Sequence, residues 1–210
     1  MTKIIYIRHG QTEWNISGRY QGQSDVALSP LGTLQAEKLA AHFPVAELSA
    51  IYSSTLSRAM RTAECIAERF GLVVQPRAEL REINFGDWEG LTYDEITKKW
   101  PEALTDFFQH PDRLAIPHGE TFPIVQARAL GCIRELCQKH TDETIAVVAH
   151  GAILRTLLAA ALHMDLQYLW TIRQFNTAVS IVCYHEDGTT SVELVNSTAH
   201  LGAAQPAGKI

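Results

Sequence analysis

Two short runs that are almost entirely apolar, Lys3–Ile7 and Thr144–Ala149, limit the fold of this chain more than any other feature. A strand with one face in water alternates apolar and polar residues, and neither run alternates. Strands of this kind are covered on both faces, as in a parallel sheet packed between layers of helices. The two runs therefore predict an α/β fold with buried central strands.

The rest of the chain supplies the other elements of such a fold. Apolar runs at Ala50–Ser53 and Ala178–Tyr184 predict two further strands, and the turn residues Glu186–Thr189 predict a hairpin after the last of them. Amphipathic patterns predict helices over residues 30–43, 56–70, 122–140 and 152–163. This alternation predicts a three-layer sandwich with a mostly parallel central sheet and an antiparallel edge hairpin.

Residues 85–120 interrupt the alternation with aromatic side chains, prolines and mixed charge. An insertion of this composition predicts a helical flap over the carboxyl edge of the sheet, where open α/β sheets bind their ligands. A length of 210 residues suits one domain. We therefore expect a single domain over residues 1–201, followed by a flexible tail over residues 202–210, which are rich in Gly, Ala and Pro.

The charge and the cysteines exclude several classes of function. With 18 Lys and Arg against 23 Asp and Glu, the net charge of -5 argues against binding to nucleic acid or to an anionic membrane. No apolar stretch reaches the roughly 18 to 20 residues of a membrane span, and the N-terminal run is too short for a signal peptide, so the expected location is cytoplasmic. The four cysteines lack the spacing of a metal or redox site and are expected to be buried as small hydrophobic side chains.

Histidine-glycine pairs follow both of the apolar runs. The first run leads into Arg8-His9-Gly10, and the later run leads into His150-Gly151. One such pair is as consistent with an ordinary surface loop as with a site, but two pairs at strand ends rarely arise by accident. Because the carboxyl ends of parallel strands form the ligand-binding edge, both imidazoles face one cleft if the two strands are neighbours.

Two further residues fit an anion site at the same edge. Arg58 lies in the first turn of the helix predicted over residues 56–70, where free N–H groups favour an anion and a guanidinium suits phosphate. Glu82 lies between Leu80 and Ile83. Removing a carboxyl group from water favours its protonated form, which a general acid needs.

These residues, taken in order along residues 3–201, resemble the histidine phosphatase superfamily, also called the phosphoglycerate mutase-like family. The matching segments are Arg8-His9-Gly10-Gln11-Thr12, Asn15, Gln21-Gly22, Arg58, Glu82 and His150-Gly151. The resemblance implies a phosphohistidine intermediate, no metal and no cofactor. It also implies a pocket in which two arginines and two histidines surround the transferred phosphoryl group.

Carried over position by position, the resemblance also implies a role for each residue. His9 matches the nucleophile, and Glu82 matches the proton donor. The residues that match groups holding the phosphoryl oxygens are Arg8, Arg58 and His150. The residues that match substrate-binding positions are Asn15, Gln21, Gly22 and Gly151. Phosphoryl transfer needs in-line attack and neutralised oxygens, and this set provides both.

The remaining histidines and tryptophans have less specific contexts. His118, where the flap returns, and His200, near the end of the domain, remain open as substrate contacts. The other histidines are expected to be solvated at helix ends, loops and turns; they are His42, His110, His140, His163 and His185. Packing roles are expected for Trp14, Trp88 and Trp100.

Three activities are compatible with this resemblance. The mutases of the family resemble one another in a basic and aromatic cluster after the proton donor, whereas Ile83–Trp88 contains no cation. The sequence from Phe85 to Gly90 looks like the branch that includes broad-specificity, phosphoserine and α-ribazole phosphatases. We therefore expect a hydrolase of small phosphomonoesters with a hydrophobic or neutral body. A mutase is the alternative, and so is a non-catalytic phospho-ligand-binding protein, although every matched position is filled. The final hairpin offers an edge at which two chains could pair as a homodimer.

Overall fold

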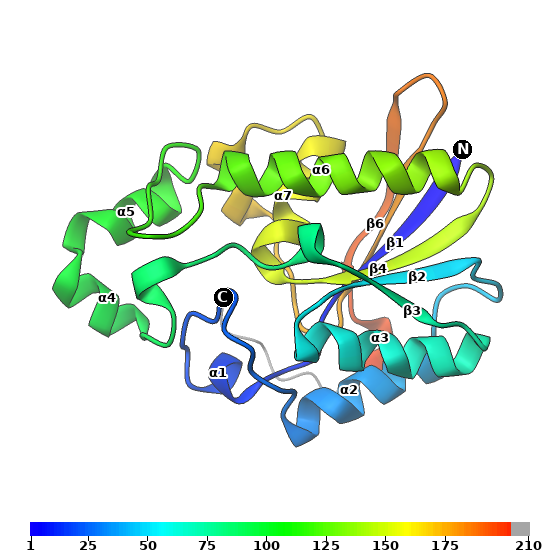
Figure 1. Ribbon diagram of the computed structural model, residues 1–210, viewed down its shortest axis with the longest axis horizontal. Helices are drawn as coiled ribbons and strands as arrows, with labels where there is room; N and C mark the ends of the chain where they lie inside the picture. The colour runs from blue at the N-terminus through cyan, green and yellow to red at the C-terminus, as the bar shows by residue number, and fades with distance from the viewer. Residues whose placement is uncertain (203–210) are drawn as a thin grey trace.

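The computed structural model describes residues 1–202 and contains, within them, a six-stranded sheet in the order β3-β2-β4-β1-β5-β6 (Figure 1). The strands are β1 (Thr2–Arg8), β2 (Ala50–Ser54), β3 (Val74–Arg77), β4 (Thr144–Ala149), β5 (Val179–Tyr184) and β6 (Thr190–Ser197). Strands β1 to β4 pair in parallel, and β5 and β6 pair antiparallel at one edge. The predicted fold class is confirmed.

The register of the central pair sets the position of the two strand-end histidines. Arg8 of β1 is level with Ala149 of β4 in a parallel ladder. His9 and His150 therefore leave the sheet at the same level of the same edge. The neighbouring strand β2 ends at Ser54, also at the carboxyl edge.

Helices form a layer on each face of the sheet. The helices are α1 (Glu13–Ile16), α2 (Pro30–Ala41), α3 (Ser57–Phe70), α4 (Tyr93–Lys99), α5 (Pro101–Gln109), α6 (Phe122–Lys139) and α7 (Gly151–Ala161), with short 3-10 helices at Ala78–Leu80, Gly86–Trp88, Leu166–Thr171 and Ala199–Leu201. α2 and α3 cover one face, and α6 and α7 cover the other (Figure 1). Local signals place their ends: the Ser29 side chain caps α2, and Gly71, at φ +64°, ends α3.

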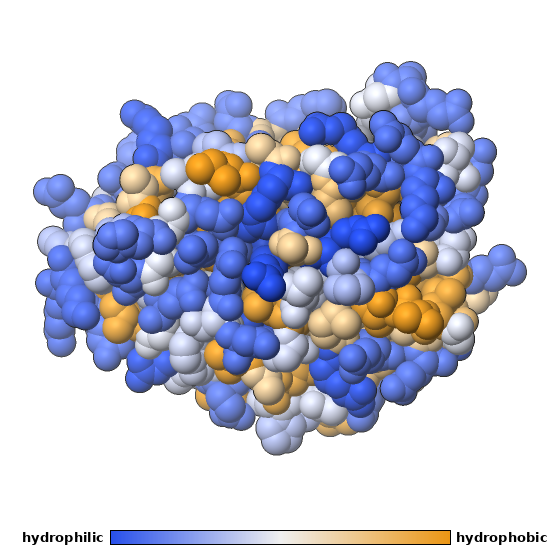
Figure 2. Space-filling view, in the orientation of Figure 1, coloured by the Kyte–Doolittle hydropathy of each residue, from blue (hydrophilic) through white to orange (hydrophobic). Residues whose placement is uncertain are grey.

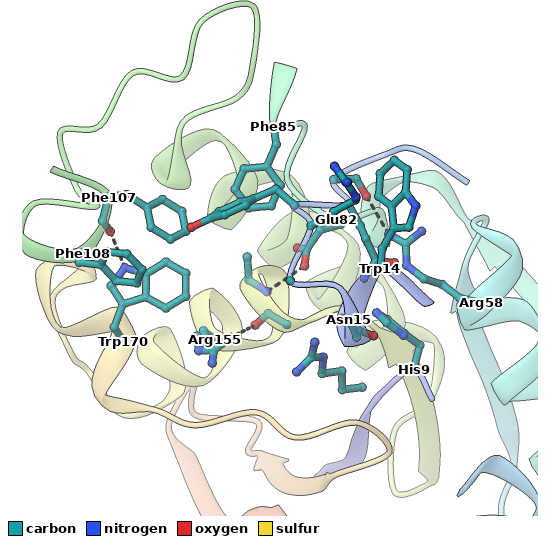
Figure 3. A pocket seen from close by; sticks show the side chains of 18 residues that line it. His9, Trp14, Asn15, Arg58, Glu82, Phe85, Phe107, Phe108, Arg155 and Trp170 are labelled. Carbon is teal, nitrogen blue, oxygen red and sulfur yellow. Dashed lines mark hydrogen bonds between the residues drawn. The ribbon is translucent and has the colours of Figure 1, made fainter. Parts of the chain in front are cut away.

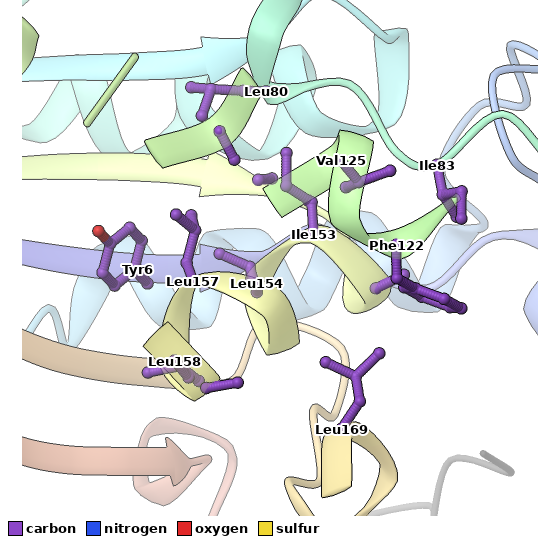
Figure 4. Close-up of a cluster of buried hydrophobic side chains, with 14 of the residues drawn as sticks. Tyr6, Leu80, Ile83, Phe122, Val125, Ile153, Leu154, Leu157, Leu158 and Leu169 are labelled. Atoms are coloured by element: carbon purple, nitrogen blue, oxygen red, sulfur yellow. The ribbon is translucent and has the colours of Figure 1, made fainter. Parts of the chain in front are cut away.

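The core explains why β1 does not alternate in the sequence. Ile4 and Tyr6 pack on the α6–α7 side, whereas Ile5 and Ile7 pack on the α2–α3 side. Both faces of the strand are therefore dry. Figure 4 shows the larger cluster, in which Tyr6 of β1 lies beside Leu157 of α7, and Val125 and Phe122 of α6 lie farther along α7. Burial of this kind stabilises the sheet by roughly 25 cal/mol per Å² of apolar surface removed from water.

The insertion at residues 85–120 forms the predicted flap. It contains α4 and α5, which lie beyond the carboxyl ends of the strands (green in Figure 1). The flap is fastened to the body of the protein through aromatic contacts and through the Trp170 indole N–H, which donates to the Phe107 carbonyl. The tail predicted at residues 202–210 falls outside the described residues except for Gly202.

Several local expectations differ from the structure. Strand β3 was not predicted, because it is only partly buried and contains Pro76, and α2 ends at Ala41 rather than at Phe43. His140 is buried rather than solvated, because its two ring nitrogens hydrogen-bond the Tyr52 hydroxyl at 2.7 Å and the Glu143 carboxylate at 2.6 Å.

The surface of the molecule and the cysteines can be compared with the expectations from composition. Hydrophilic side chains cover most of the face in Figure 2, and hydrophobic ones reach it in separate patches. All four cysteines are free; Cys65, Cys132 and Cys183 are buried as expected, whereas Cys137, near the end of α6, is only partly buried. Among the described residues, no helix is long and apolar enough to cross a membrane.

Candidate active site

A pocket of about 150 Å³ opens at the carboxyl edge of the sheet, between the strand ends and the flap (Figure 3). Most of the residues singled out in the sequence line it, namely Arg8, His9, Asn15, Gln21, Gly22, Arg58, Glu82 and Gly151. His150 does not line the pocket but lies behind His9, with 5.1 Å between the ring centroids. The nine predicted residues therefore gather in one place.

The environment of His9 leaves one ring nitrogen free to attack. Its Nδ1 lies 2.6 Å from the Gly10 carbonyl, and because a carbonyl only accepts, Nδ1 carries the proton. Nε2 then holds the lone pair. Burial lowers the pKa of His9 well below its ordinary value, and the charges of Arg58 and Arg8 lower it further. His9 is therefore a neutral imidazole at neutral pH.

His150 is fully buried and is held by the neighbouring strand. Its Nε2 lies 2.7 Å from the Ser54 hydroxyl at the end of β2. Its Nδ1 is buried and has no hydrogen-bond partner within residues 1–202. Burial, followed by the charge of Arg58, lowers the pKa of His150 well below its ordinary value. A buried, unpaired ring nitrogen beside His9 is a polar group available to a ligand.

Arg8 and Arg58 both bring positive charge to the site. Arg58 is almost fully buried and donates from Nη1 to the Ser24 carbonyl at 2.9 Å and from Nη2 to the Gly22 carbonyl at 2.7 Å. Arg8 donates to the Gln174 carbonyl. The Nε atoms of both arginines are buried without a partner in the described part of the chain. Burial lowers the pKa of Arg58 to about 10, which leaves it charged at neutral pH and able to bind an anion.

Thr12 orients the two amide side chains. Its backbone N–H donates to Oδ1 of Asn15 at 3.1 Å, as part of a capping box at α1, and its hydroxyl donates to Oε1 of Gln21 at 2.9 Å. Because the oxygen of each amide is engaged by Thr12, each NH₂ group is the end that can donate elsewhere. Both residues line the pocket, so these groups provide further donors there.

The two predicted glycines shape the site through close approaches. Gly22 has φ +51°, and a Cβ at this position would lie 2.0 Å from Glu89 Oε1. That carboxylate accepts hydrogen bonds from the backbone of Gln23 and Ser24, which holds the loop behind Arg58. A Cβ at Gly151 would lie 3.2 Å from Arg155 Nη1 and 3.5 Å from Arg8 Nε. Gly151 therefore lets two guanidiniums approach the backbone closely.

Glu82 lies at the N-terminus of α7. Its Oε2 accepts from the Ala152 N–H at 3.0 Å, and its Oε1 accepts from Ile153 at 3.1 Å and from its neighbour Ile83 at 3.0 Å. The prediction considered only the apolar neighbours of Glu82, which is indeed buried. It missed the N–H donors of Ala152 and Ile153 because they come from a helix about 70 residues away in the sequence.

Sequence reasoning also missed Arg128, which holds the segment that carries Glu82. Its guanidinium donates to the Arg81 carbonyl at 2.7 Å and to the Glu82 carbonyl at 3.0 Å, and it pairs with Glu120 at 2.9 Å. Glu120 in turn accepts from the Asn84 N–H at 2.8 Å. These bonds fix the backbone on both sides of the Glu82 carboxylate.

The pocket contains other residues that were not predicted there. Arg155 of α7 lines it and is buried. An arginine in an otherwise apolar helix, one turn after His150-Gly151, was the available signal. The apolar wall is aromatic (Figure 3) and consists of Phe85, Phe107, Phe108 and Trp170.

Trp14, expected only to pack, also lines the pocket, whereas Trp88 is fully buried in the core. The two histidines left open lie elsewhere. His118 is exposed, with Nδ1 3.0 Å from Asp87, and His200 contacts the Thr177 hydroxyl at 3.0 Å.

The two buried histidines predict a loss of stability in acid. Their folded-state pKa values lie well below 6.5, so below pH 6.5 the unfolded chain binds more protons than the folded chain. The free energy of unfolding should therefore fall as the pH is lowered from 6.5, by up to about 1.4 kcal/mol per pH unit for each histidine. Urea unfolding at pH 7.0 and 5.5 measures this loss. His9→Asn should show a smaller loss, and an identical loss would contradict the assignment.

Comparisons with known proteins agree with this geometry. The family model of the histidine phosphatase superfamily (branch 1) matches residues 4–197. Phosphoserine phosphatase 1 of Hydrogenobacter thermophilus is 35% identical over 202 residues, which cover 96% of this chain and 95% of that protein. The metal-independent phosphoserine phosphatase of Arabidopsis thaliana is 38% identical over 160 residues, which cover 75% of this chain and 67% of that protein.

A solved structure shows the same fold over the whole length of the domain. YhfR of Bacillus stearothermophilus superposes with a TM-score of 0.91 at 37% identity, covering 96% of this chain and 100% of that chain. The match of the family model, the identity to curated phosphatases and this superposition agree with one another. The chain therefore belongs to the histidine phosphatase superfamily, branch 1.

Proposed function

We propose that this phosphatase hydrolyses small phosphomonoesters through a phosphohistidine formed at Nε2 of His9, with Glu82 as the proton donor. The observation that carries the proposal is the set of unsatisfied groups around that atom. The lone pair of His9 faces a pocket in which the Nε atoms of Arg8 and Arg58 are buried without partners. A phosphoryl group provides an electrophilic phosphorus for the lone pair of His9. Its oxygens accept hydrogen bonds from the Nε–H groups of Arg8 and Arg58.

In the first step, Nε2 of His9 attacks phosphorus and the bond to the ester oxygen breaks. Arg8 and Arg58 neutralise the charge on the equatorial oxygens, and the amide groups of Asn15 and Gln21 donate to the same group. Donors fixed in advance by the fold stabilise such charge without reorganisation; removing one typically costs about 10² to 10³ in rate. A proton from Glu82 leaves with the alcohol, which gives phospho-His9 and a free alcohol.

In the second step, water attacks the phosphoryl group of phospho-His9. Glu82 accepts the proton of the attacking water, the N–P bond breaks, and inorganic phosphate leaves. Glu82 thus returns to its protonated form, ready for the next turnover. Its position, fixed by three main-chain N–H groups, suits a group that must act in both steps.

The hydrolase is favoured over the two alternatives. A mutase must pass the phosphoryl group to a second alcohol faster than to water, and the relatives compared above carry phosphatase names. A non-catalytic binding protein does not need a neutral histidine whose lone pair faces a phosphate site. Release of phosphate from p-nitrophenyl phosphate by the purified protein tests the hydrolase, and an absence of turnover with this ester and with every other phosphomonoester would exclude it.

Activity is expected to persist in excess EDTA. The charge that a metal ion would bring to phosphoryl transfer is supplied by Arg8 and Arg58, and a pKa of about 10 keeps the Arg58 guanidinium charged at neutral pH. The turnover of p-nitrophenyl phosphate, measured before and after exhaustive chelation, should agree within error. A loss of activity that Mg²⁺, Mn²⁺ or Zn²⁺ restores would show that the proposed charge balance is wrong.

The expectations on organisation and location also remain proposals. We propose that residues 1–201 act as one catalytic domain in the cytoplasm, where the four free cysteines would stay reduced. Strand β6, at the end of the sheet, offers an edge for a homodimer. Light scattering coupled to gel filtration would test the dimer: a mass near 23.3 kDa would exclude it.

A further inference from the structure

Arg155 is a buried cation that forms no ion pair within residues 1–202, and the nearest influence of an acid on it is the longer-range attraction of Glu82. It lies in α7, is only 7% exposed and lines the pocket. Among the described residues, no acidic side chain forms an ion pair with it. Burying an unpaired guanidinium is costly, and such a group gains strongly from an anion that enters with a ligand.

The groups that do hold Arg155 are neutral. Its Nε donates to the Ile172 carbonyl at 2.7 Å, and its Nη1 donates to the Gly151 carbonyl at 3.2 Å. The Trp170 ring lies 5.0 Å from Cζ. Within residues 1–202, Nη2 has no hydrogen-bond partner. These contacts fix the plane of the guanidinium and leave both its charge and one amino group available.

The position of Arg155 sets where a second anion of the ligand would lie. Arg155 Nη1 and Arg8 Nε lie 3.2 Å and 3.5 Å from the position that a Cβ on Gly151 would occupy. A phosphoryl group bound at Arg8 and an anion bound at Arg155 are therefore separated by only a few covalent bonds. The aromatic wall of Phe107, Phe108 and Trp170 lines the pocket on the side of Arg155, with the Trp170 ring against the guanidinium, and limits the size of the ligand there.

We propose that Arg155 binds the carboxylate of the substrate, so that the substrate class is short phosphomonoesters of hydroxy acids. The Nη2 amino group, which has no partner among the described residues, can donate to one oxygen of that carboxylate, and a single negative charge matches the single charge of the guanidinium. The inference rests on the proposed phosphatase function and adds its specificity. It also departs from the hydrophobic or neutral body expected from the sequence, since that expectation did not include Arg155.

The test uses two substrates that differ only in the carboxylate. O-phospho-L-serine and O-phosphoethanolamine share the ester and the amine, and the ethanolamine ester lacks the carboxylate. For the wild-type protein, kcat/KM should be about 30-fold or more higher for phosphoserine, as is typical for a desolvated charge pair. Arg155→Gln should bring this ratio close to one, mainly through KM for phosphoserine. Arg155→Lys, which keeps the charge and loses the planar fork, should give an intermediate ratio.

The ratio of kcat/KM for the two substrates separates binding of the carboxylate from a structural role, because damage to the fold lowers kcat/KM for both substrates together. Arg19→Gln is the matched control: Arg19 also lines the pocket, but its charge is already paired with Glu95 at 3.3 Å. This variant should keep the wild-type ratio.

Two results would overturn the inference. In one, Arg155→Gln slows both substrates equally, which would mean that Arg155 contacts the transferred phosphoryl group or only supports α7. In the other, the wild-type protein hydrolyses p-nitrophenyl phosphate but shows the same kcat/KM for phosphoserine and for phosphoethanolamine. The proposed function would then stand, and the role of Arg155 in binding a carboxylate would be wrong. An absence of turnover with every phosphomonoester would remove the proposed function as well.

Discussion

His9→Ala is expected to lower kcat for phosphomonoester hydrolysis by at least about 10⁴-fold, because removing a covalent nucleophile leaves only the contribution of binding and charge. The lone pair of Nε2 is the only electron pair in the proposed mechanism that attacks phosphorus in the first step. Arg8 and Arg58 would still bind phosphate in the variant. The measurement is steady-state turnover of p-nitrophenyl phosphate, with circular dichroism to show that the variant is folded.

His118→Ala is the control for this loss. His118 is exposed and bonded to Asp87, outside the residues that line the pocket. We expect it to keep turnover within a factor of about two, because exposed side chains away from a site seldom contribute to its chemistry. If His9→Ala turned over at the wild-type rate, the covalent mechanism would be wrong.

Glu82→Gln is expected to slow poor leaving groups far more than good ones. An alkoxide needs a proton as it departs, whereas p-nitrophenolate is stable without one. The rate of phosphoenzyme formation from phosphoserine should fall on the order of 10²-fold or more, and that from p-nitrophenyl phosphate should fall much less. Single-turnover kinetics with both substrates isolates this first step from the hydrolysis of phospho-His9, which also needs Glu82.

The neighbouring carboxylates provide the comparison. Asp87 is bonded to His118 on the surface, and Glu89 holds the backbone of Gln23 and Ser24. Glu89→Gln is therefore expected to lower the rates with both substrates by the same factor. Asp87→Asn and Glu79→Gln are expected to leave both rates unchanged. Equal slowing of both substrates by Glu82→Gln would indicate a binding role, and a leaving-group-dependent defect in Asp87→Asn would move the proton donor to that residue.

The elements that the sequence predicts well are those with a strong local cause. Strand β1 is apolar because Ile4 and Ile5 point to opposite, equally buried faces. Helix α2 begins where Ser29 and Pro30 provide a cap and a fixed φ. The placement of His9 beside His150 could also be predicted, because parallel strands bring their carboxyl ends together whatever lies between them in the sequence.

The residues that escaped prediction depend on partners distant in the sequence. The bonds of Glu82 come from the N-terminus of α7, and the importance of Arg155 depends on the absence of an acidic partner in the described structure, which no sequence window displays. His140 is buried only because β2 places Tyr52 against it. Strand β3 carries little periodicity because it is short and half-exposed.

The phosphoenzyme itself offers the most direct measurement of the central claim. Wild-type protein mixed with radiolabelled phosphoserine and quenched in alkali, in which phosphohistidine survives, can be digested and its labelled peptide sequenced. Because Nδ1 of His9 donates to the Gly10 carbonyl, the label is predicted on His9 and at Nε2. A label on another residue or on Nδ1 of His9, or the absence of any labelled peptide during active turnover, would contradict the mechanism.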